Sequence, residues 1–213
     1  MSPRSKQQNE QIKEDRRAQI LDAALVVFAR RGLAATKIGD IATQAGLSHG
    51  LVYHYFPSKE DIFTELISIA DRSSSSALLQ AEQMPLPPME KLRAIAQLVL
   101  QSIWESSESA CMFYLMAQAM MSDNTPPKAK EILAQFGTPY KVLTRIIAQG
   151  QDEGAIAPGD AGALAKVFWA MIQGLATYRL VQPDTMALPD VDILMRLFVS
   201  PSPLMRLGDP DDL

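Results

Sequence analysis

Apolar residues recur at helical spacing through almost the whole chain, and this pattern constrains the fold more than any other feature. In residues 16–31 they return every three or four positions, as on one face of an α-helix. No stretch shows the clean alternation between two turn signals that is typical of a β-strand. We therefore predict an all-α protein of about nine helices. The expected helices span about residues 16–31, 37–45, 49–56, 59–83, 88–106, 108–122, 127–153, 160–181 and 189–199.

Turn and capping residues set the expected boundaries of the first four helices. Gly32 is expected to end the first helix, and Thr36 to cap the start of the second. Gly46 breaks the chain before Ser48, which is expected to cap the third helix, and Ser58 opens a capping box for the fourth. Further along, Gly137-Thr138-Pro139 predicts a kink or break within residues 127–153, because proline removes a backbone donor.

The two short helices after residue 36 are too short to form a core alone. Packed on the first helix, they predict a three-helix helix-turn-helix unit. In such units the second helix of the motif enters the major groove of DNA.

The charge is distributed unevenly along the chain. The net charge is −4, yet residues 1–60 hold nine Lys and Arg against six Asp and Glu, whereas residues 61–213 hold eleven against eighteen. An acidic total therefore does not exclude nucleic-acid binding, because counterion release from DNA needs only a local basic face.

No apolar run approaches the roughly 20 residues needed to cross a membrane. The first residues are polar and lack the apolar core of a secretory signal, and a single cysteine, Cys111, predicts no internal disulfide. We expect a cytoplasmic protein.

Residues 48–55 have an unusual composition of two histidines, two tyrosines, a serine and a glycine. A metal site is not expected here, because the five-residue spacing of the histidines puts them on different helix faces and no cysteine or third histidine lies nearby. A surface that contacts sugars, phosphates and base edges fits better. The expected inward side chains are Leu47, Val52 and Phe56; the expected outward ones are His49, Tyr53, His54 and Tyr55, and Gly50 lets the backbone approach DNA.

The stretch LSHGLVYHYFPSKEDIF strongly resembles the recognition-helix signature of the TetR (tetracycline repressor) family. The preceding RRGLAATKIGDIATQAG resembles the end of that family's first helix and its second helix, so the resemblance spans about residues 16–66. It implies Ser48, His49, Gly50, Tyr53, Tyr55 and Lys59 at the DNA, and Thr36 and Lys37 near a phosphate. His54 is added as a candidate DNA contact from its expected outward position on the same helix. Position 49 is often Lys, Arg or Pro in the family, so His49 leaves the base preference open.

With this resemblance we predict three parts of the chain. Residues 1–60 form the DNA-binding domain, with residues 1–12 as a flexible arm; residues 61–199 form a helical effector-binding and dimerisation domain; residues 200–213 form a loose tail. The predicted function is ligand-controlled repression at a palindromic operator in double-stranded DNA, by a homodimer without cofactor or membrane association. A small, largely apolar effector is expected to release the operator. Activation remains an open alternative.

A stripe of methionine and aromatic residues lies in the second part. It can be packed core, or it can line the effector cavity that the resemblance implies, since methionine favours adaptable binding surfaces. The candidate ligand residues are Trp104, Met112, Phe113, Met116, Met120, Tyr140, Phe168 and Met171. Two smaller questions stay open: whether Glu105, Glu108 and Asp123 hold a cationic ligand or are solvated helix ends, and whether Cys111 is a packed thiol or a redox sensor.

The last two expected helices carry more apolar surface than one chain can hide. We predict a two-fold dimer through a four-helix bundle of residues 160–181 and 189–199, with Ala170 and Gly174 allowing close approach. The candidate interface residues are Trp169, Ala170, Gly174, Leu194, Leu197 and Phe198.

Other classes of protein are disfavoured. No nucleophile–base–orienter set and no glycine-rich phosphate loop occurs in the sequence, so we do not predict an enzyme. The rivals are a small helical enzyme or a small-molecule carrier that uses the methionine-rich region, and a helical adaptor with the tyrosines as an interface hot spot.

Overall fold

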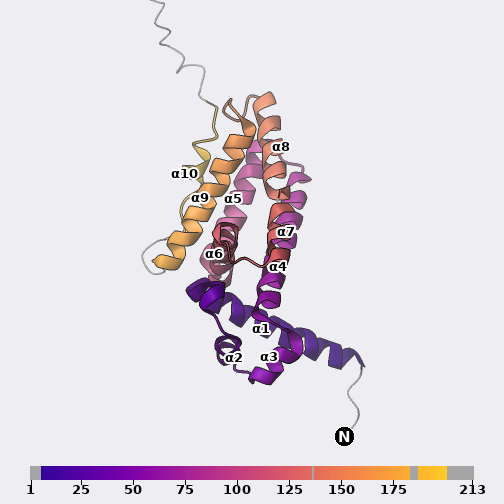
Figure 1. Ribbon diagram of the computed structural model, residues 1–213. Helices are drawn as coiled ribbons and strands as arrows, with labels where there is room; N and C mark the ends of the chain where they lie inside the picture. Colours follow the sequence, from indigo (N-terminus) through magenta and orange to yellow (C-terminus); the bar gives the residue numbers. More distant parts are fainter. Residues whose placement is uncertain (1–5, 136, 183–186, 201–213) are drawn as a thin grey trace, which may run out of the picture. The chain divides into compact units, whose positions relative to one another are not determined.

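The computed structural model describes residues 6–135, 137–182 and 187–200, and the regular structure there is helical (Figure 1). No strand occurs in these ranges; a single bridge pairs Ile156 with Val199. The all-α prediction is confirmed. None of the helices described is both long and apolar enough to cross a membrane. The helices are α1 (Lys6–Ala35), α2 (Ile38–Ala45), α3 (His49–Tyr55), α4 (Lys59–Glu82), α5 (Pro88–Glu105), α6 (Ser107–Met121), α7 (Pro127–Gln135), α8 (Thr138–Asp152), α9 (Ala161–Val181) and α10 (Val191–Met195).

The chain forms two compact packing units. The first takes residues 1–73 and 105–136, and the second takes residues 74–104 and 137–213. The first unit extends beyond the predicted 1–60 domain because α6 packs on α1. Packing therefore does not divide the chain at residue 60, and the assignment of separate functions to residues 1–60 and 61–199 stays a prediction.

In the first unit, α2 packs on α1 (Figure 1). The buried apolar residues of α1 form the core there. Phe28 of α1 is fully buried and meets the ring of Phe63 in α4 edge-on, with ring centroids 5.5 Å apart. Ile41 of α2 and Val52 of α3 are also fully buried. The short helices thus obtain their core from α1, as their length requires.

Helix α1 begins earlier than expected. Residues 6–12, which we predicted to belong to a flexible arm, are helical from Lys6 onward. Gln, Glu and Lys are good helix formers, and Gln11 Nε2 donates to Asp15 Oδ1 one turn later at 2.9 Å. At the other end Gly32 adopts φ 72°, so the regular helix is interrupted at the expected residue. The predicted loose tail lies, apart from Ser200, outside the described residues.

The caps of the short helices are confirmed with one exception. Gly46 ends α2 with φ 65°, and the Ser48 hydroxyl accepts a hydrogen bond from Leu51 N at the start of α3. The N-cap of α2, however, is Lys37 and not Thr36. Thr36 instead donates its hydroxyl hydrogen to Gly32 O at 2.7 Å, so its side chain bonds to the end of α1 and not to the start of α2.

Two differences concern the C-terminal half. The predicted break at Gly137-Thr138-Pro139 is confirmed, and it divides residues 127–153 into α7 and α8, which makes ten helices among the described residues. The last helix is shorter than predicted, because the chain beyond Met195 turns back on the segment after α8: Ala157 N donates to Phe198 O at 2.9 Å.

Candidate nucleic-acid interface

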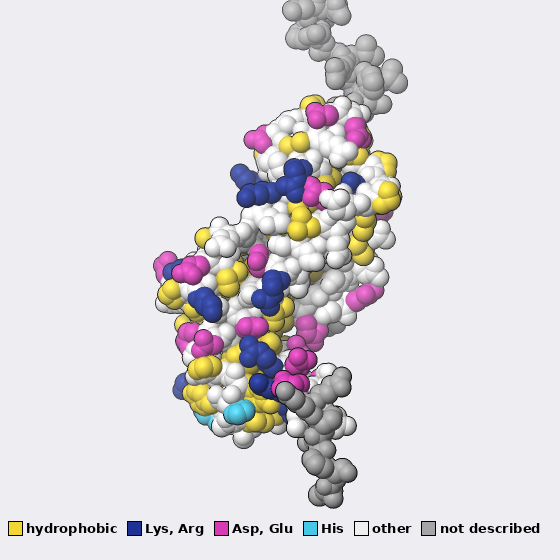
Figure 2. Space-filling model, turned by 90° about the vertical axis from the view of Figure 1, so that its right-hand side faces the viewer, with side chains coloured by type: hydrophobic (Ala, Val, Ile, Leu, Met, Phe, Trp, Pro, Cys, Tyr) yellow, Lys and Arg dark blue, Asp and Glu magenta, His cyan; other side chains and the backbone are white. Residues whose placement is uncertain are grey.

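Helix α3 is amphipathic, with its apolar side held in the first packing unit. Val52 is fully buried and Phe56, directly after the helix, is 2% exposed. On the other side His49 and His54 are exposed, and Tyr53 is 50% exposed. Figure 2 shows histidine side chains at the surface, close to Lys and Arg and to hydrophobic residues. These three side chains form the outward face of α3, as predicted.

Helix α1 holds both short helices in place. Gln19 Nε2 donates to Ala45 O, the last residue of α2, at 2.7 Å. The Arg17 guanidinium lies 4.3 Å from the centre of the Phe56 ring and pairs with Glu65 of α4 at 3.3 Å. These residues carry no local signal in the sequence, because their partners are distant in the chain.

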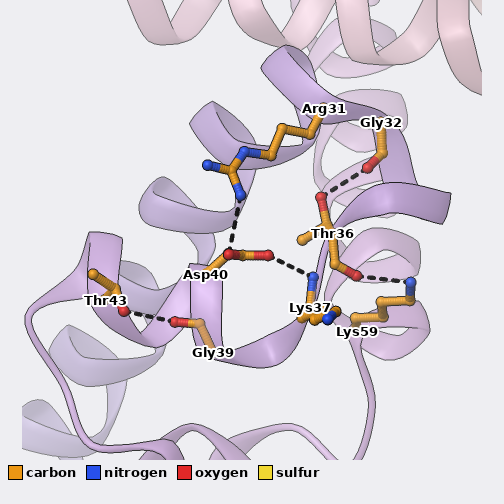
Figure 3. A network of polar contacts seen from close by, with 8 residues as sticks. All are labelled: Arg31, Gly32, Thr36, Lys37, Gly39, Asp40, Thr43 and Lys59. Atoms are coloured by element: carbon orange, nitrogen blue, oxygen red, sulfur yellow. Dashed lines mark hydrogen bonds and ion pairs between the residues drawn. The ribbon is translucent and has the colours of Figure 1, made fainter.

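A polar network ties the start of α2 to α1 (Figure 3). The Asp40 carboxylate accepts hydrogen bonds from Lys37 N at 2.9 Å and from Arg31 Nη1 at 3.0 Å. The hydrogen bond from the Lys37 backbone, together with the Arg31 charge, lowers the pKa of Asp40 below its ordinary value. An acidic residue in the first turn of a short helix is the sequence signal that would have found this site.

Lys59 makes contacts within the fold that the sequence did not predict. Its ammonium group donates to the carbonyl oxygen of Thr36 at 2.8 Å, as Figure 3 shows. It also donates to the carbonyl oxygens of Leu33 at 2.8 Å and of Ala34 at 3.2 Å. An ammonium group has three protons, so this set occupies all of them. In this structure Lys59 ties α4 to the end of α1, and its contact with DNA stays a prediction.

The Thr36 side chain also makes its contact within the fold, and the place of this residue near a phosphate stays a prediction. It is 1% exposed, and its hydroxyl is used by Gly32 O, so its side chain does not present a donor to a phosphate. Lys37, next in the chain, is exposed and remains a candidate for that contact.

The other residues predicted at the DNA lie at the start and end of α3. Ser48 is exposed while its hydroxyl caps the helix, and Gly50 is exposed with open space where a side chain would stand. Tyr55 is half-buried, and the ring of His54 meets it edge-on at 5.2 Å. These four residues remain predictions for DNA contact.

The predicted effector residues belong to both packing units. The first unit holds Met112, Phe113, Met116 and Met120, all on α6, and the second holds Trp104, Tyr140, Phe168 and Met171. Met116 is buried, whereas Met120 is half exposed. Phe168 is fully buried against Phe198, with ring centroids 5.8 Å apart, which is a core contact.

The surroundings of three acidic residues and of the cysteine bear on the two smaller alternatives raised by the sequence. Glu105, Glu108 and Asp123 are exposed, and Glu108 accepts a hydrogen bond from Ser106 at the start of α6, as a solvated helix end does. Cys111 is buried, and burial raises the pKa of its thiol, which favours a packed thiol over a redox sensor.

Three of the six residues predicted at the dimer interface are buried in the core of the second unit. Trp169, Leu194 and Phe198 are at most 9% exposed, so they do not offer their surface to a second copy. They are buried because α9 also packs on α8 and because residue 198 pairs with residue 157. Ala170, Gly174 and Leu197 are exposed.

An exposed α3, capped by Ser48 and joined to α2 by a tight turn on a supporting first helix, defines a helix-turn-helix DNA-binding protein. The family described as "Bacterial regulatory proteins, tetR family" matches residues 20–66, and the one described as "BetI-type transcriptional repressor, C-terminal" matches residues 88–200. The chain therefore belongs to the TetR family of transcriptional regulators.

Individual relatives agree with this membership. The regulator AcrR of Shigella flexneri is 33% identical over 90 residues, a match that spans 42% of each chain. The repressor KstR2 of Mycobacterium tuberculosis is 28% identical over 67% of this chain and 70% of its own. The solved structure of AibR with isovaleryl coenzyme A and operator DNA shares the fold, with a TM-score of 0.71 and 20% identity over 88% of this chain and 100% of that one.

Proposed function

We propose that this regulator is a homodimeric repressor whose two α3 helices bind the half-sites of a palindromic operator. The observation that carries the proposal is the exposed face of α3, formed by His49, Tyr53 and His54 above the buried Val52 and Phe56. Histidine and tyrosine side chains on an exposed helix provide hydrogen-bonding groups for base edges and phosphates. Repression is supported by the description of the family that matches the C-terminal part.

The surface that we propose for dimerisation is an exposed stripe on α9. Its members follow one another at spacings of three and four residues, so they share one helix face: Val167, Ala170, Gly174, Tyr178 and Val181. Val181 is 72% exposed and Val167 is 45% exposed. Several exposed apolar side chains along one helix face are typical of an interaction surface. Gly174 has open space above its Cα, where a helix of a second copy can approach closely.

The effector that we propose is a small, largely apolar molecule that contacts the methionine-rich face of α6. Flexible methionine side chains repack around a guest at little cost. Because α6 packs on α1, a change at α6 reaches the helix whose Gln19 and Arg17 hold α2 and α3. The solved AibR structure contains both isovaleryl coenzyme A and operator DNA, so a protein of the same fold binds a ligand as well as DNA. The candidate residues of the second unit remain predictions.

The effector must bind the DNA-incompetent state more tightly than the DNA-competent one. If 99% of the free protein is in the DNA-competent state, converting 99% of it to the other state takes a difference of about 5.5 kcal/mol between the effector's binding free energies for the two states. Tight binding to both states alike does not produce release.

The DNA-binding part is tested by selecting duplexes from a random pool with the purified chain. We expect an inverted repeat whose half-site centres lie about 10 base pairs, or a multiple of that, apart. His49→Ala should change the preferred base at one position per half-site, with a loss of about 1–3 kcal/mol of discrimination. Enrichment of no duplex would contradict DNA binding, and an unchanged motif would contradict base reading by His49.

The effector part is tested by operator release with a panel of neutral aromatic molecules and of quaternary ammonium ions of similar size. We expect release by a neutral compound, and Met116→Trp should blunt that release while the operator affinity without ligand is kept. Met121→Trp, at a residue that is 87% exposed, is the matched control. Release by the cations alone, or full release from Met116→Trp, would contradict the proposed class or place of the effector.

A further inference from the structure

The imidazole of His49 lies against the backbone of α2, in the space that a side chain at Gly39 would occupy. A Cβ atom added at Gly39 would lie 3.1 Å from His49 Nε2 and 3.5 Å from His49 Cδ2. The first of these distances is shorter than an ordinary van der Waals contact between carbon and nitrogen. The absence of a side chain at Gly39 is therefore what lets the ring come this close.

A second contact limits the same ring from within α3. Tyr53, one helical turn after His49, meets the imidazole edge-on, with ring centroids 5.5 Å apart and an angle of 75° between the planes. His54, the other histidine of α3, instead meets Tyr55. Of the two histidines, His49 is thus the one whose ring is placed by both α2 and α3.

The position of Gly39 is itself well determined. Its carbonyl oxygen accepts the Thr43 hydroxyl at 2.8 Å, and the adjacent Asp40 is held by Lys37 N and Arg31 (Figure 3). Gly39 lies within α2 and has no positive φ, so its backbone conformation is open to any residue. Alanine is a better helix former than glycine at such a site. What glycine contributes here is space and not backbone freedom.

We propose that Gly39 is a positioning residue that sets the orientation of the His49 imidazole and, through it, the base preference of α3. This inference rests on the proposed DNA-binding function of α3. A hydrogen bond to a base edge depends steeply on the distance and angle of the donor and acceptor. A methyl group at position 39 moves the ring by a few tenths of an ångström, and a larger side chain displaces it from α2 altogether.

The test combines Gly39→Ala and Gly39→Leu with His49→Ala in a double-mutant cycle, read out by duplex selection and by the affinities for the selected operator and its single-base variants. We expect Gly39→Ala to reduce discrimination at the same half-site position as His49→Ala does, by about threefold or more, and Gly39→Leu to reduce it further. In the His49→Ala background Gly39→Ala should have no additional effect. Gln44→Ala, at an exposed residue of the same helix, is the control and should leave the motif unchanged.

A purely structural role would affect stability and would not be confined to one base position. We therefore expect the denaturation midpoint of Gly39→Ala to equal or exceed that of the wild-type chain. The inference is overturned if Gly39→Ala and Gly39→Leu leave the motif unchanged, or if Gly39→Ala changes it equally when His49 is absent. If the wild-type chain selects no duplex at all, the proposed function fails first, and the inference falls with it.

Discussion

The ammonium group of Lys59, at the first turn of α4, donates a hydrogen bond to Leu33 O near the end of α1 at 2.8 Å. The same group donates to Thr36 O at 2.8 Å, in the short link between α1 and α2. Lys59 thereby ties α4 to the end of α1 and to the link that leads into α2. The end of a helix leaves its last carbonyl groups without helical partners, and a cation is favourable there.

We expect Lys59→Ala to destabilise the chain by about 1–2 kcal/mol, because it leaves part-buried carbonyl groups without a charged donor. Chemical denaturation measures this change. The slope of operator affinity against salt concentration should stay the same, because the Lys59 ammonium group donates to carbonyl oxygens within the fold. Lys37→Ala is the matched comparison: it should lower the slope by about one per protomer with little effect on stability. A reduced slope in Lys59→Ala at unchanged stability would show that Lys59 contacts a phosphate.

The dimer is expected to dissociate when a charge is placed on the stripe of α9. Gly174→Arg puts a guanidinium where we propose that a second helix packs, and an unpaired buried charge costs several kcal/mol. Light scattering after size-exclusion chromatography at micromolar concentration should show a dimer for the wild-type chain and a monomer for this variant. Gln80→Arg, at an exposed residue of α4, should remain dimeric. A dimeric Gly174→Arg would place the interface elsewhere.

The pH dependence of stability has a specific contributor in the second unit. The Glu82 carboxylate accepts hydrogen bonds from Arg145 Nε at 2.7 Å and Nη2 at 2.8 Å, and this interaction lowers the pKa of Glu82 below the ordinary value of 4.5. A lowered folded-state pKa stabilises the fold above the unfolded value, and the contribution is lost as the pH falls through the folded one. The Arg145 side chain is 55% exposed, so we expect a modest effect of about 0.5–1 kcal/mol.

Glu82→Gln should therefore lower the denaturation midpoint at neutral pH and flatten its decline below about pH 4.5. Thermal denaturation across a pH series measures both. Glu131→Gln, at an exposed residue of α7, serves as the control. An acid decline as steep in Glu82→Gln as in the wild-type chain would show that this pair does not contribute.

Cys111 should react slowly in the folded protein. Burial raises the pKa of its thiol, which disfavours the reactive thiolate. Alkylation by iodoacetamide at about pH 8 should be at least about tenfold slower in the native chain than in denaturant. Equal rates in the two states would support an accessible, redox-responsive cysteine.

Features set by residues close in the chain could be predicted from the sequence. The caps at Gly46 and Ser48 and the inward positions of Val52 and Phe56 follow from local conformational preferences and helical periodicity. The break before Pro139 has the same local origin.

Features that depend on distant partners could not be predicted. Lys59 binds carbonyl groups 23 to 26 positions earlier in the chain, and its place in the motif predicted only a contact with DNA. Phe198 is a large apolar residue in an apolar segment, which suggested an interface. Its backbone pairs with Ala157, however, and its side chain is fully buried. The contact of His49 with Gly39 likewise depends on how α2 and α3 pack.

The most direct test of the account is the affinity of Tyr53→Ala for the selected operator, compared with the wild-type chain at equal ionic strength. Tyr53 is half exposed on α3, while its neighbour Val52 supplies the buried contact, so the substitution should leave the fold intact. We predict that the affinity falls about tenfold or more, for unrelated duplexes as well as for the operator, because the ring and hydroxyl contact the DNA backbone. An affinity within about twofold of wild type would contradict the central claim that this face of α3 binds DNA.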